Sequence, residues 1–400
     1  MIITEYLQTL VDKECDVLVC GGGFGGIAAA LAAVREKKRV ILLERQYILG
    51  GLGTAGLVTI YLPICDGLGH QVSFGIAEEL LRLSICMGAE RDFPAIWLDR
   101  GRAAERGPKT PRYRTSFNPQ LFAIHAERLL CASGVQILYG TYAVGAYVEE
   151  DKIHSVIVEN KTGRRGIRAH SVVDATGDCD IAHFAGVPVK VFSKGNVLAA
   201  WYYSCGQTGY RLNPLGTADI SDEMKKEEGS VELKADRIFV GLTEEELSDF
   251  MILSHEAILC HIQEQRAYDK DYIPVSIPSI PQLRMTRRIV GEYELSECDA
   301  HTFFADSVGM IPDWRKRGPV YEVPFRTLYS SQCKNLITAG RCISVTEGMW
   351  EIMRVIPCCA VTGQAAGTAA AMTDDFSRLD IKMLQRRLEE RGVVLHWQRI

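Results

Sequence analysis

One segment near the start of the chain constrains the fold more than any other. A short apolar run, residues 15–20, leads directly into a glycine-rich turn at residues 21–26. Residues 27–34 are strong helix formers, and a second apolar run, 40–43, ends at Glu44. This order of strand, glycine turn, helix and strand within about 30 residues predicts the first unit of a dinucleotide-binding α/β fold.

The glycines of this turn have the spacing of a dinucleotide fingerprint. Gly21, Gly23 and Gly26 occupy the G-x-G-x-x-G positions. These positions make the tight turn, let the backbone approach a pyrophosphate and let helix and strand pack closely. The N-terminus of the following helix offers free N–H groups to the phosphates. Glu44 is placed to accept hydrogen bonds from ribose and would repel a 2′-phosphate, so the segment disfavours NADP and leaves FAD and NAD open.

Four further segments carry glycine signals. Residues 51–56 repeat the glycine spacing but follow a loop, so we interpret them as backbone lying along a ribityl chain and flavin ring. An apolar strand ends in residues 175–178, and a later strand enters a glycine turn within residues 335–342. Residues 354–372 predict a small-residue helix that packs closely against a ring. Its N-terminus can stabilise negative charge on a reduced flavin.

As an ordered set, these segments resemble the FAD-dependent oxidoreductases of the glutathione-reductase-like superfamily. Within it, the chain is similar to a large bacterial family named for FAD-dependent oxidoreductase activity. The similar stretches are the fingerprint and residues 174–178, 286–291, 323–326, 339–344 and 363–368. The resemblance implies an extended FAD, with its ADP half on residues 21–44 and its flavin near Arg341 and Gly363. The catalytic arginine and substrate-binding histidines of the related fumarate reductases have no recognisable counterpart here.

From these segments we expect a non-covalently bound FAD and no metal ion, although the sequence does not decide whether the flavin is attached covalently. The residues expected to bind the cofactor are Gly21, Gly23, Phe24, Gly25, Gly26, Glu44, Arg45, Gly51, Gly53, Thr54, Ala175, Thr176, Gly177, Asp178, Gly340, Arg341, Gly363 and Gln364.

Three residues are candidates for catalysis. Arg354 directly precedes the small-residue helix, where it would pair with an acidic substrate. Arg284 lies on a strand-like segment and shares one face with Arg288, while Arg287 takes the other; structural salt bridges are the alternative. His70 follows the expected flavin loop as a candidate acid or base, against the alternative of an ordinary polar histidine.

The predicted fold class is α/β: a glutathione-reductase-like FAD-binding Rossmann domain, with a parallel sheet and a β-ribbon, and an inserted α+β substrate domain. The FAD-binding domain is expected to be discontinuous, with residues 1–200 and 325–375. Residues 201–324 form the insert, and residues 376–400 form a terminal helix and tail. Strands at 135–147 and 152–160 would make the ribbon.

The composition of the chain limits the classes of partner that we expect. Lys and Arg number 45 against 50 Asp and Glu, a net charge of −5, so there is no global positive field and nucleic acid is not an expected partner. No apolar run approaches the roughly 20 residues of a membrane span. Residues 1–14 lack the basic start of a signal peptide, so a cytoplasmic location is expected.

Cysteines and charged loops leave alternatives open. The 13 cysteines include no C-x-x-C, so the spacing of zinc, iron–sulfur and thioredoxin-type sites is absent. The neighbours Cys358 and Cys359 are either a redox dithiol or two core thiols. Arginine-rich residues 89–115 are either a lid that pairs with an anionic substrate or a solvated loop. Residues 222–236 are interpreted as a surface loop.

The resulting hypothesis is an FAD-dependent oxidoreductase that transfers a hydride between a small organic substrate and flavin N5. Its substrate, its direction and its electron partner stay open, since no second dinucleotide domain for NAD(P)H is evident. Two alternatives remain. One is a flavin with a structural or non-redox role, as in an isomerase or modification enzyme. The other is a non-catalytic dinucleotide-binding subunit.

Overall fold

The computed structural model describes the chain except residues 1–2, 5, 87–113, 217–232, 234 and 400. Seven strands form the central sheet in the order β5-β2-β1-β8-β7-β6, with β16 also paired to β8. Their bounds are β1 Leu10–Cys20, β2 Val40–Glu44, β5 Gln136–Tyr139, β6 Tyr142–Glu149, β7 Lys152–Asn160, β8 Gly163–Asp174 and β16 Leu336–Thr338. The β5, β2, β1, β8 and β16 strands run parallel, whereas β7 and β6 continue from β8 as an antiparallel ribbon. The predicted α/β fold with a parallel sheet and a β-ribbon is confirmed.

Helices pack on this sheet and on one another. Their bounds are α1 Phe24–Arg35, α2 Ile76–Ile85, α5 Pro119–Ser133, α6 Asp180–Phe184, α9 Glu347–Met353, α10 Ile356–Ala370 and α11 Ile381–Glu390. Helix α1 begins at Phe24, so the last fingerprint glycines form its first turn, and the helix starts earlier than the apolar run at 27–34 predicts. In the part of the chain that the structure describes, no helix has the length and apolarity needed to cross a bilayer.

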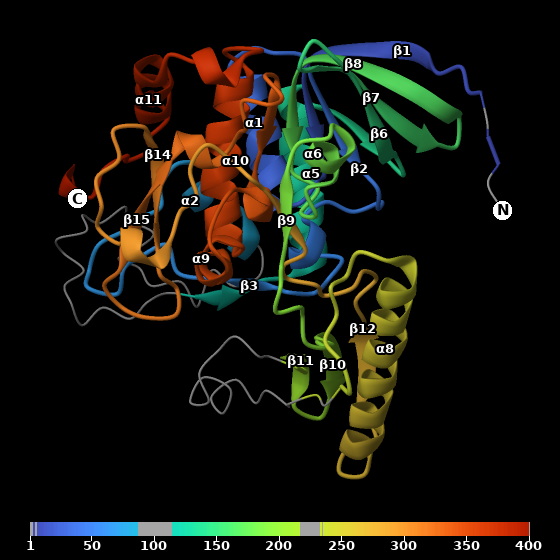
Figure 1. Ribbon diagram of the computed structural model, residues 1–400. Helices are drawn as coiled ribbons and strands as arrows, with labels where there is room; N and C mark the ends of the chain where they lie inside the picture. Colours follow the sequence, from blue (N-terminus) through green and yellow to red (C-terminus); the bar gives the residue numbers. More distant parts are fainter. Residues whose placement is uncertain (1–2, 5, 87–113, 217–232, 234, 400) are drawn as a thin grey trace.

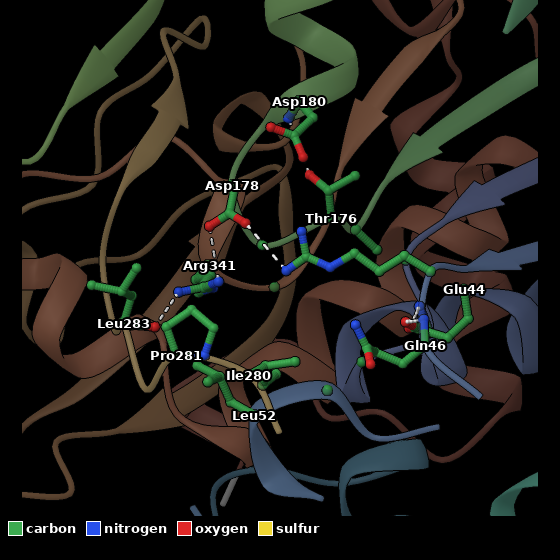
Figure 2. Close-up of a pocket in the computed structure, with 18 of the residues that line it drawn as sticks. Glu44, Gln46, Leu52, Thr176, Asp178, Asp180, Ile280, Pro281, Leu283 and Arg341 are labelled. Atoms are coloured by element: carbon green, nitrogen blue, oxygen red, sulfur yellow. Dashed lines mark hydrogen bonds and ion pairs between the residues drawn. The ribbon is translucent and has the colours of Figure 1, made fainter. Parts of the chain in front are cut away.

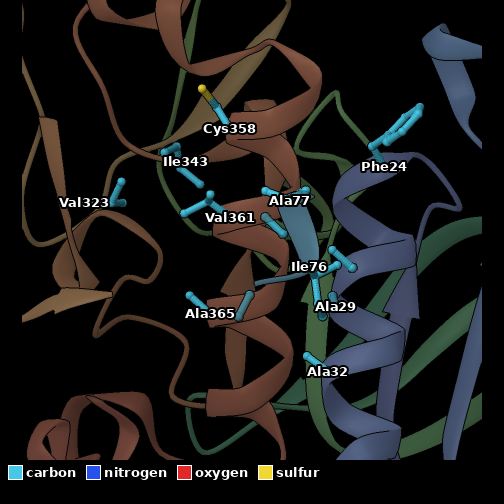
Figure 3. Close-up of a cluster of buried hydrophobic side chains, with 14 of the residues drawn as sticks. Phe24, Ala29, Ala32, Ile76, Ala77, Val323, Ile343, Cys358, Val361 and Ala365 are labelled. Carbon is cyan, nitrogen blue, oxygen red and sulfur yellow. The ribbon is translucent and has the colours of Figure 1, made fainter. Parts of the chain in front are cut away.

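Helices α1 and α10 touch through their backbones. A Cβ added at Gly363 would lie 2.2 Å from the carbonyl oxygen of Gly25, and one added at Gly367 would lie 2.1 Å from that of Ala29. Figure 3 shows the small side chains of Ala29 and Ala365 among the buried residues around these two helices. The glycine and alanine content of residues 354–372 therefore serves helix packing.

Gly367→Ala is expected to lower the free energy of unfolding by roughly 1–3 kcal/mol, because the added methyl group meets backbone that cannot rotate away. Urea unfolding measures the change. Gly145→Ala is the matched control, since a Cβ there would meet Ile157 at an ordinary 3.7 Å. Equal losses in the two variants would contradict the close backbone contact of α1 and α10.

The inserted unit lies beside the main body and carries its own cores (Figure 1). It contains a three-stranded antiparallel sheet, β11-β10-β12, and the long helix α8. The bounds are β10 Tyr202–Gly206, β11 Gly209–Asn213, β12 Ile273–Ser276 and α8 Glu244–Arg266. This unit has the mixed helix and strand content expected of the α+β insert.

Three pairs of short strands lie outside these two sheets in the described part of the chain. They are β3 Ile60–Tyr61 with β4 Thr115–Ser116, β9 Val189–Val191 with β13 Arg287–Ile289, and β14 Ser307–Pro312 with β15 Val320–Pro324. Strand β14 contacts α10 and α11 of the main body. The predicted domain boundaries stay a prediction.

Candidate cofactor-binding and active site

A cavity of about 820 Å³ opens where the parallel strands end. Cys20, Glu44, Ala175 and Ala339 line it, and each ends or directly follows one of the strands β1, β2, β8 and β16. The carboxyl ends of parallel strands meet at one edge of a sheet, which is where open α/β folds bind their ligands. The volume lies in the upper part of the range for ligand pockets.

The fingerprint glycines each meet a different spatial demand. Gly21 has φ +105°, and an added Cβ would lie 2.4 Å from the carbonyl oxygen of Ala175. At Gly26 it would lie 1.8 Å from the oxygen of Gly21, so this glycine allows α1 to pack on the turn. Gly23 has open space where its Cβ would be, and it begins α1 without a side-chain cap or an acid in the first turn. The start of α1 therefore offers room and N–H groups to an anionic group.

Glu44 is anchored at the cavity by two backbone donors. Its Oε2 accepts the N–H of Gly22 at 2.9 Å, and its Oε1 accepts that of Gln46 at 2.7 Å. Burial raises the pKa of Glu44, and these hydrogen bonds oppose the rise. Each oxygen keeps a second lone pair, so the carboxylate can also accept ligand hydroxyls.

An arginine–aspartate pair lies across the cavity from Glu44 (Figure 2). Arg341 donates through Nη2 to Asp178 Oδ1 at 3.0 Å and through Nη1 to the carbonyl oxygens of Leu283 and Arg284 at 2.7 and 3.0 Å. Thr286 Oγ1 donates to the same Asp178 oxygen at 2.7 Å. The pair thereby ties the dinucleotide cradle to the segment that leaves the insert.

Asp180 adds an acid with an unusual pKa to this edge of the cavity. Burial, together with the negative charges of Asp178 and Asp174, raises the pKa of Asp180 to about 6. Arg287 opposes the rise by donating to its Oδ1 at 2.6 Å. Arg45, another residue of the lining, has its guanidinium 3.9 Å from Asp178 Oδ2.

Similarity to known proteins shows the family to which this chain belongs. Residues 16–198 and 221–388 match the family described as FAD dependent oxidoreductase. The chain belongs to that family. Its cofactor is FAD, and three features of the cavity fit this dinucleotide: the uncapped start of α1, the open face of Gly23 and the buried Glu44 carboxylate at the end of β2.

Individual relatives are more distant. Aklavinone 12-hydroxylase DnrF of Streptomyces peucetius is 25% identical over 236 residues, which is 49% of this chain and 46% of the relative. The chain thus aligns with less than half of that relative's length. A geranylgeranyl bacteriochlorophyll reductase-like protein of Thermoplasma acidophilum is similar at 16% identity and a TM-score of 0.43, over 95% of this chain and 84% of that one. A 3-ketosteroid-Δ4-(5α)-dehydrogenase of Rhodococcus jostii RHA1 shows 12% identity and a TM-score of 0.43, over 91% and 98% of the two chains.

Most residues predicted to bind the cofactor of this FAD-dependent oxidoreductase line the cavity. They are Gly21, Gly23, Phe24, Gly25, Glu44, Arg45, Gly51, Gly53, Ala175, Thr176, Gly177, Asp178, Gly340 and Arg341. Gly26, Thr54, Gly363 and Gln364 lie outside the lining. Thr54 Oγ1 donates to the carbonyl oxygen of Leu49 at 2.5 Å, and Gln364 Oε1 accepts the N–H of Ile76 at the start of α2 at 2.8 Å. Gly26 and Gly363 instead provide the close backbone packing described above.

The catalytic candidates are not brought together. Arg354 lines the cavity, and burial lowers its pKa to about 10. Arg284 lies next to the lining residue Leu283 without lining the cavity itself. His70 lies elsewhere: its Nδ1 is 2.8 Å from Asp66 Oδ2, and its ring meets Trp397 edge to face.

Other sequence expectations find places of their own. Arg284 precedes β13, while Arg287 and Arg288 lie in it and pair with Asp180 and Glu294. Cys359 lines the cavity beside the buried Cys358, both are free thiols, and burial raises the pKa of Cys359 to about 12, which disfavours thiolate chemistry. The arginine-rich lid lies almost wholly outside the described residues, as does most of the 222–236 loop.

Part of the lining was not predicted from the sequence. The insert contributes one face of helix α8, namely Leu247, Ser248, Met251, Ile252 and His255, together with Ile280, Pro281 and Leu283. The available signal was the apolar residues of α8 four and five positions apart, at 247, 251 and 252. Such a pattern indicates a surface that faces something outside the helix's own core, without saying what.

Glu44→Ala is expected to raise the Kd for FAD at least about tenfold, because a charged acceptor for ligand hydroxyls and for two backbone N–H groups is lost. Fluorescence titration of the FAD-free chain measures this Kd. Glu127→Ala is the control, since that glutamate accepts a hydrogen bond from the Tyr139 hydroxyl and does not line the cavity. An unchanged Kd in Glu44→Ala would contradict a role for Glu44 in FAD binding.

Asp180→Asn is expected to change the pH dependence of stability. The pKa of Asp180 is about 6 in the folded chain against 3.8 for an ordinary aspartate, so folding favours its protonated form. The wild type should therefore gain stability over the variant as the pH falls from 8 to 5, by roughly 1 kcal/mol. Urea unfolding of both proteins at one fixed FAD concentration measures the difference, and parallel pH curves would refute the assignment.

Proposed function

We propose that this chain is an oxidoreductase that transfers a hydride between a small organic substrate and the N5 atom of FAD. One observation carries the proposal. One cavity is lined both by the residues of the dinucleotide cradle and by residues of the insert, on α8 and at 280–283. A substrate held by the insert would therefore share one space with the cofactor. When bound, FAD supplies the two-electron chemistry that side chains lack.

The chain's own residues supply position and charge. Leu247, Met251 and Ile280 give the insert side of the cavity an apolar surface, which suits an organic substrate and excludes water from it. Arg354 brings a positive charge to the lining next to the start of α10. Its pKa of about 10 keeps the guanidinium charged at neutral pH, where it can stabilise negative charge that develops nearby.

The proposed site residues follow from this division. The cofactor side is the set of predicted residues that line the cavity, and the substrate side is the α8 face with residues 280–283. Arg354, which lines the same cavity just before α10, is the proposed catalytic residue. His70 is not proposed for catalysis, because it is bound to Asp66 and does not line the cavity.

The test is a spectrum of the purified chain under anaerobic conditions, followed by acid precipitation. We expect two flavin absorbance bands, near-stoichiometric FAD in the supernatant, and bleaching of the longer-wavelength band when a substrate or a reduced nicotinamide donates electrons. A colourless chain that cannot be reconstituted with FAD would refute the cofactor assignment in this chain. A flavin that stays oxidised throughout turnover would favour the non-redox alternative instead.

A further inference from the structure

Two hydrogen-bond donors beside the cavity lack acceptors. Trp201 is 5% exposed, and its indole Nε1 has no hydrogen-bond partner. The guanidinium carbon of Arg284 lies 5.0 Å from the centre of a Trp201 ring. Arg284 uses its backbone N–H and carbonyl in hydrogen bonds, but across the described ranges of the chain no hydrogen bond or ion pair reaches its guanidinium.

Neighbouring arginines are different in this respect. Arg287 pairs with Asp180, Arg288 with Glu294, and Arg341 with Asp178. Arg284 comes from the same stretch of chain and has no such carboxylate among the residues that the structure describes. Burial and the nearby charge of Arg341 lower the pKa of Arg284 to about 10, so it is still charged at neutral pH. The Arg284 side chain is half-buried and stays a charged donor that is open to an external acceptor, beside the buried Trp201 N–H that has no acceptor in the protein.

The backbone around this donor pair is fixed from several sides. Asn196 Oδ1 accepts the N–H of Arg284 at 2.9 Å, and Arg341 donates to its carbonyl. Gln282 bonds both the N–H and the carbonyl of Trp201, at 2.9 and 3.1 Å. Gln282 also donates to the carbonyl oxygen of Gly56, at the end of the expected flavin loop, at 2.5 Å. These bonds fix the backbone of Arg284 and Trp201 beside the cavity, and they leave the guanidinium and the indole N–H free to donate to a ligand.

The chemistry of the missing partner follows from the donors. Both groups only donate, so the ligand must present acceptor oxygens. A planar guanidinium matches the two oxygens of a carboxylate, and the indole face beneath it suits an attached apolar group. We propose that Arg284 and Trp201 form a carboxylate-binding subsite beside the cavity, which receives the acidic group of an organic substrate. That the ligand is a substrate rests on the proposed function; the binding of a carboxylate does not.

Calorimetric titration of the FAD-loaded chain tests this subsite with benzoate and with benzamide, which has the same size and no charge. We expect benzoate to bind at least tenfold more tightly than benzamide. Arg284→Met should abolish this preference, and Trp201→Phe, which removes the N–H but keeps an aromatic face, should reduce it several-fold. Arg326→Gln is the charge control, since Arg326 is an exposed arginine paired with Asp306. Equal binding of acid and amide by the wild type would overturn the proposal.

Melting temperatures separate binding from a structural role. Arg284→Met and Trp201→Phe should melt no lower than the wild type, because the Trp201 N–H has no acceptor in the protein and a methionine at position 284 can still pack on the indole ring. Trp314→Phe is the matched control and should melt lower, since that indole donates to the Glu351 carbonyl oxygen at 3.0 Å. A lower melting temperature for Arg284→Met with the acid preference retained would overturn the subsite.

The remaining outcomes identify the source of the acceptor. If Arg284→Met weakens FAD binding and leaves the acid preference intact, the partner is an oxygen of FAD and the proposal is wrong. If the purified chain holds no FAD but prefers benzoate over benzamide, the proposed function fails and the carboxylate subsite stands. The two failures are therefore distinguishable in the same pair of titrations.

Discussion

Helix α1 meets backbone on three sides, and these contacts position the rest of the site. Gly26 packs on the turn at Gly21, where an added Cβ would lie 1.8 Å from a carbonyl oxygen. A Cβ added at Gly25 would lie 3.2 Å from the Cα atom of Gly340, and one added at Gly363 of α10 would meet the carbonyl oxygen of Gly25. Glycines from three separate segments of the sequence thus bring the fingerprint, the 340–342 turn and α10 to one place. Side chains at these points would separate the elements whose ends form the cavity.

The side chain of Arg341 joins the insert to the dinucleotide cradle. Arg341 follows strand β16, and its guanidinium reaches Asp178 after β8 and the carbonyls of Leu283 and Arg284. Gly177 leaves room for this side chain, since an added Cβ would lie 2.6 Å from Arg341 Nε. A change at Arg341 would therefore disturb the cofactor side and the substrate side together. Such a partly buried network is worth more intact than its separate pairs suggest.

The positions where the backbone requires glycine could be predicted from the sequence, whereas the contacts between distant segments could not. The spacing of Gly21, Gly23 and Gly26 predicted the turn and the cavity, because few other structures need glycine at those points. The small residues of α10 predicted a close approach to a flat ring, whereas the close contact that the structure shows is with the backbone of helix α1. Gln364 was expected at the cofactor, whereas it binds the start of α2 at Ile76. The α8 lining left only the apolar spacing at 247 and 251 as a local signal, and the position of His70 beside Trp397 left none, since both depend on contacts between distant segments.

The unpaired donors at Arg284 and Trp201 are tolerable because the surrounding frame is so strongly determined. Asn196, Gln282 and Arg341 fix the backbone on which both donors sit, and none of these bonds uses the donors themselves. The buried Trp201 N–H without an acceptor has a cost that the packing of the rest of the fold offsets. The glycine contacts keep the surrounding frame rigid. This rigid frame holds the Arg284 and Trp201 donors in position for the carboxylate that we propose as their ligand.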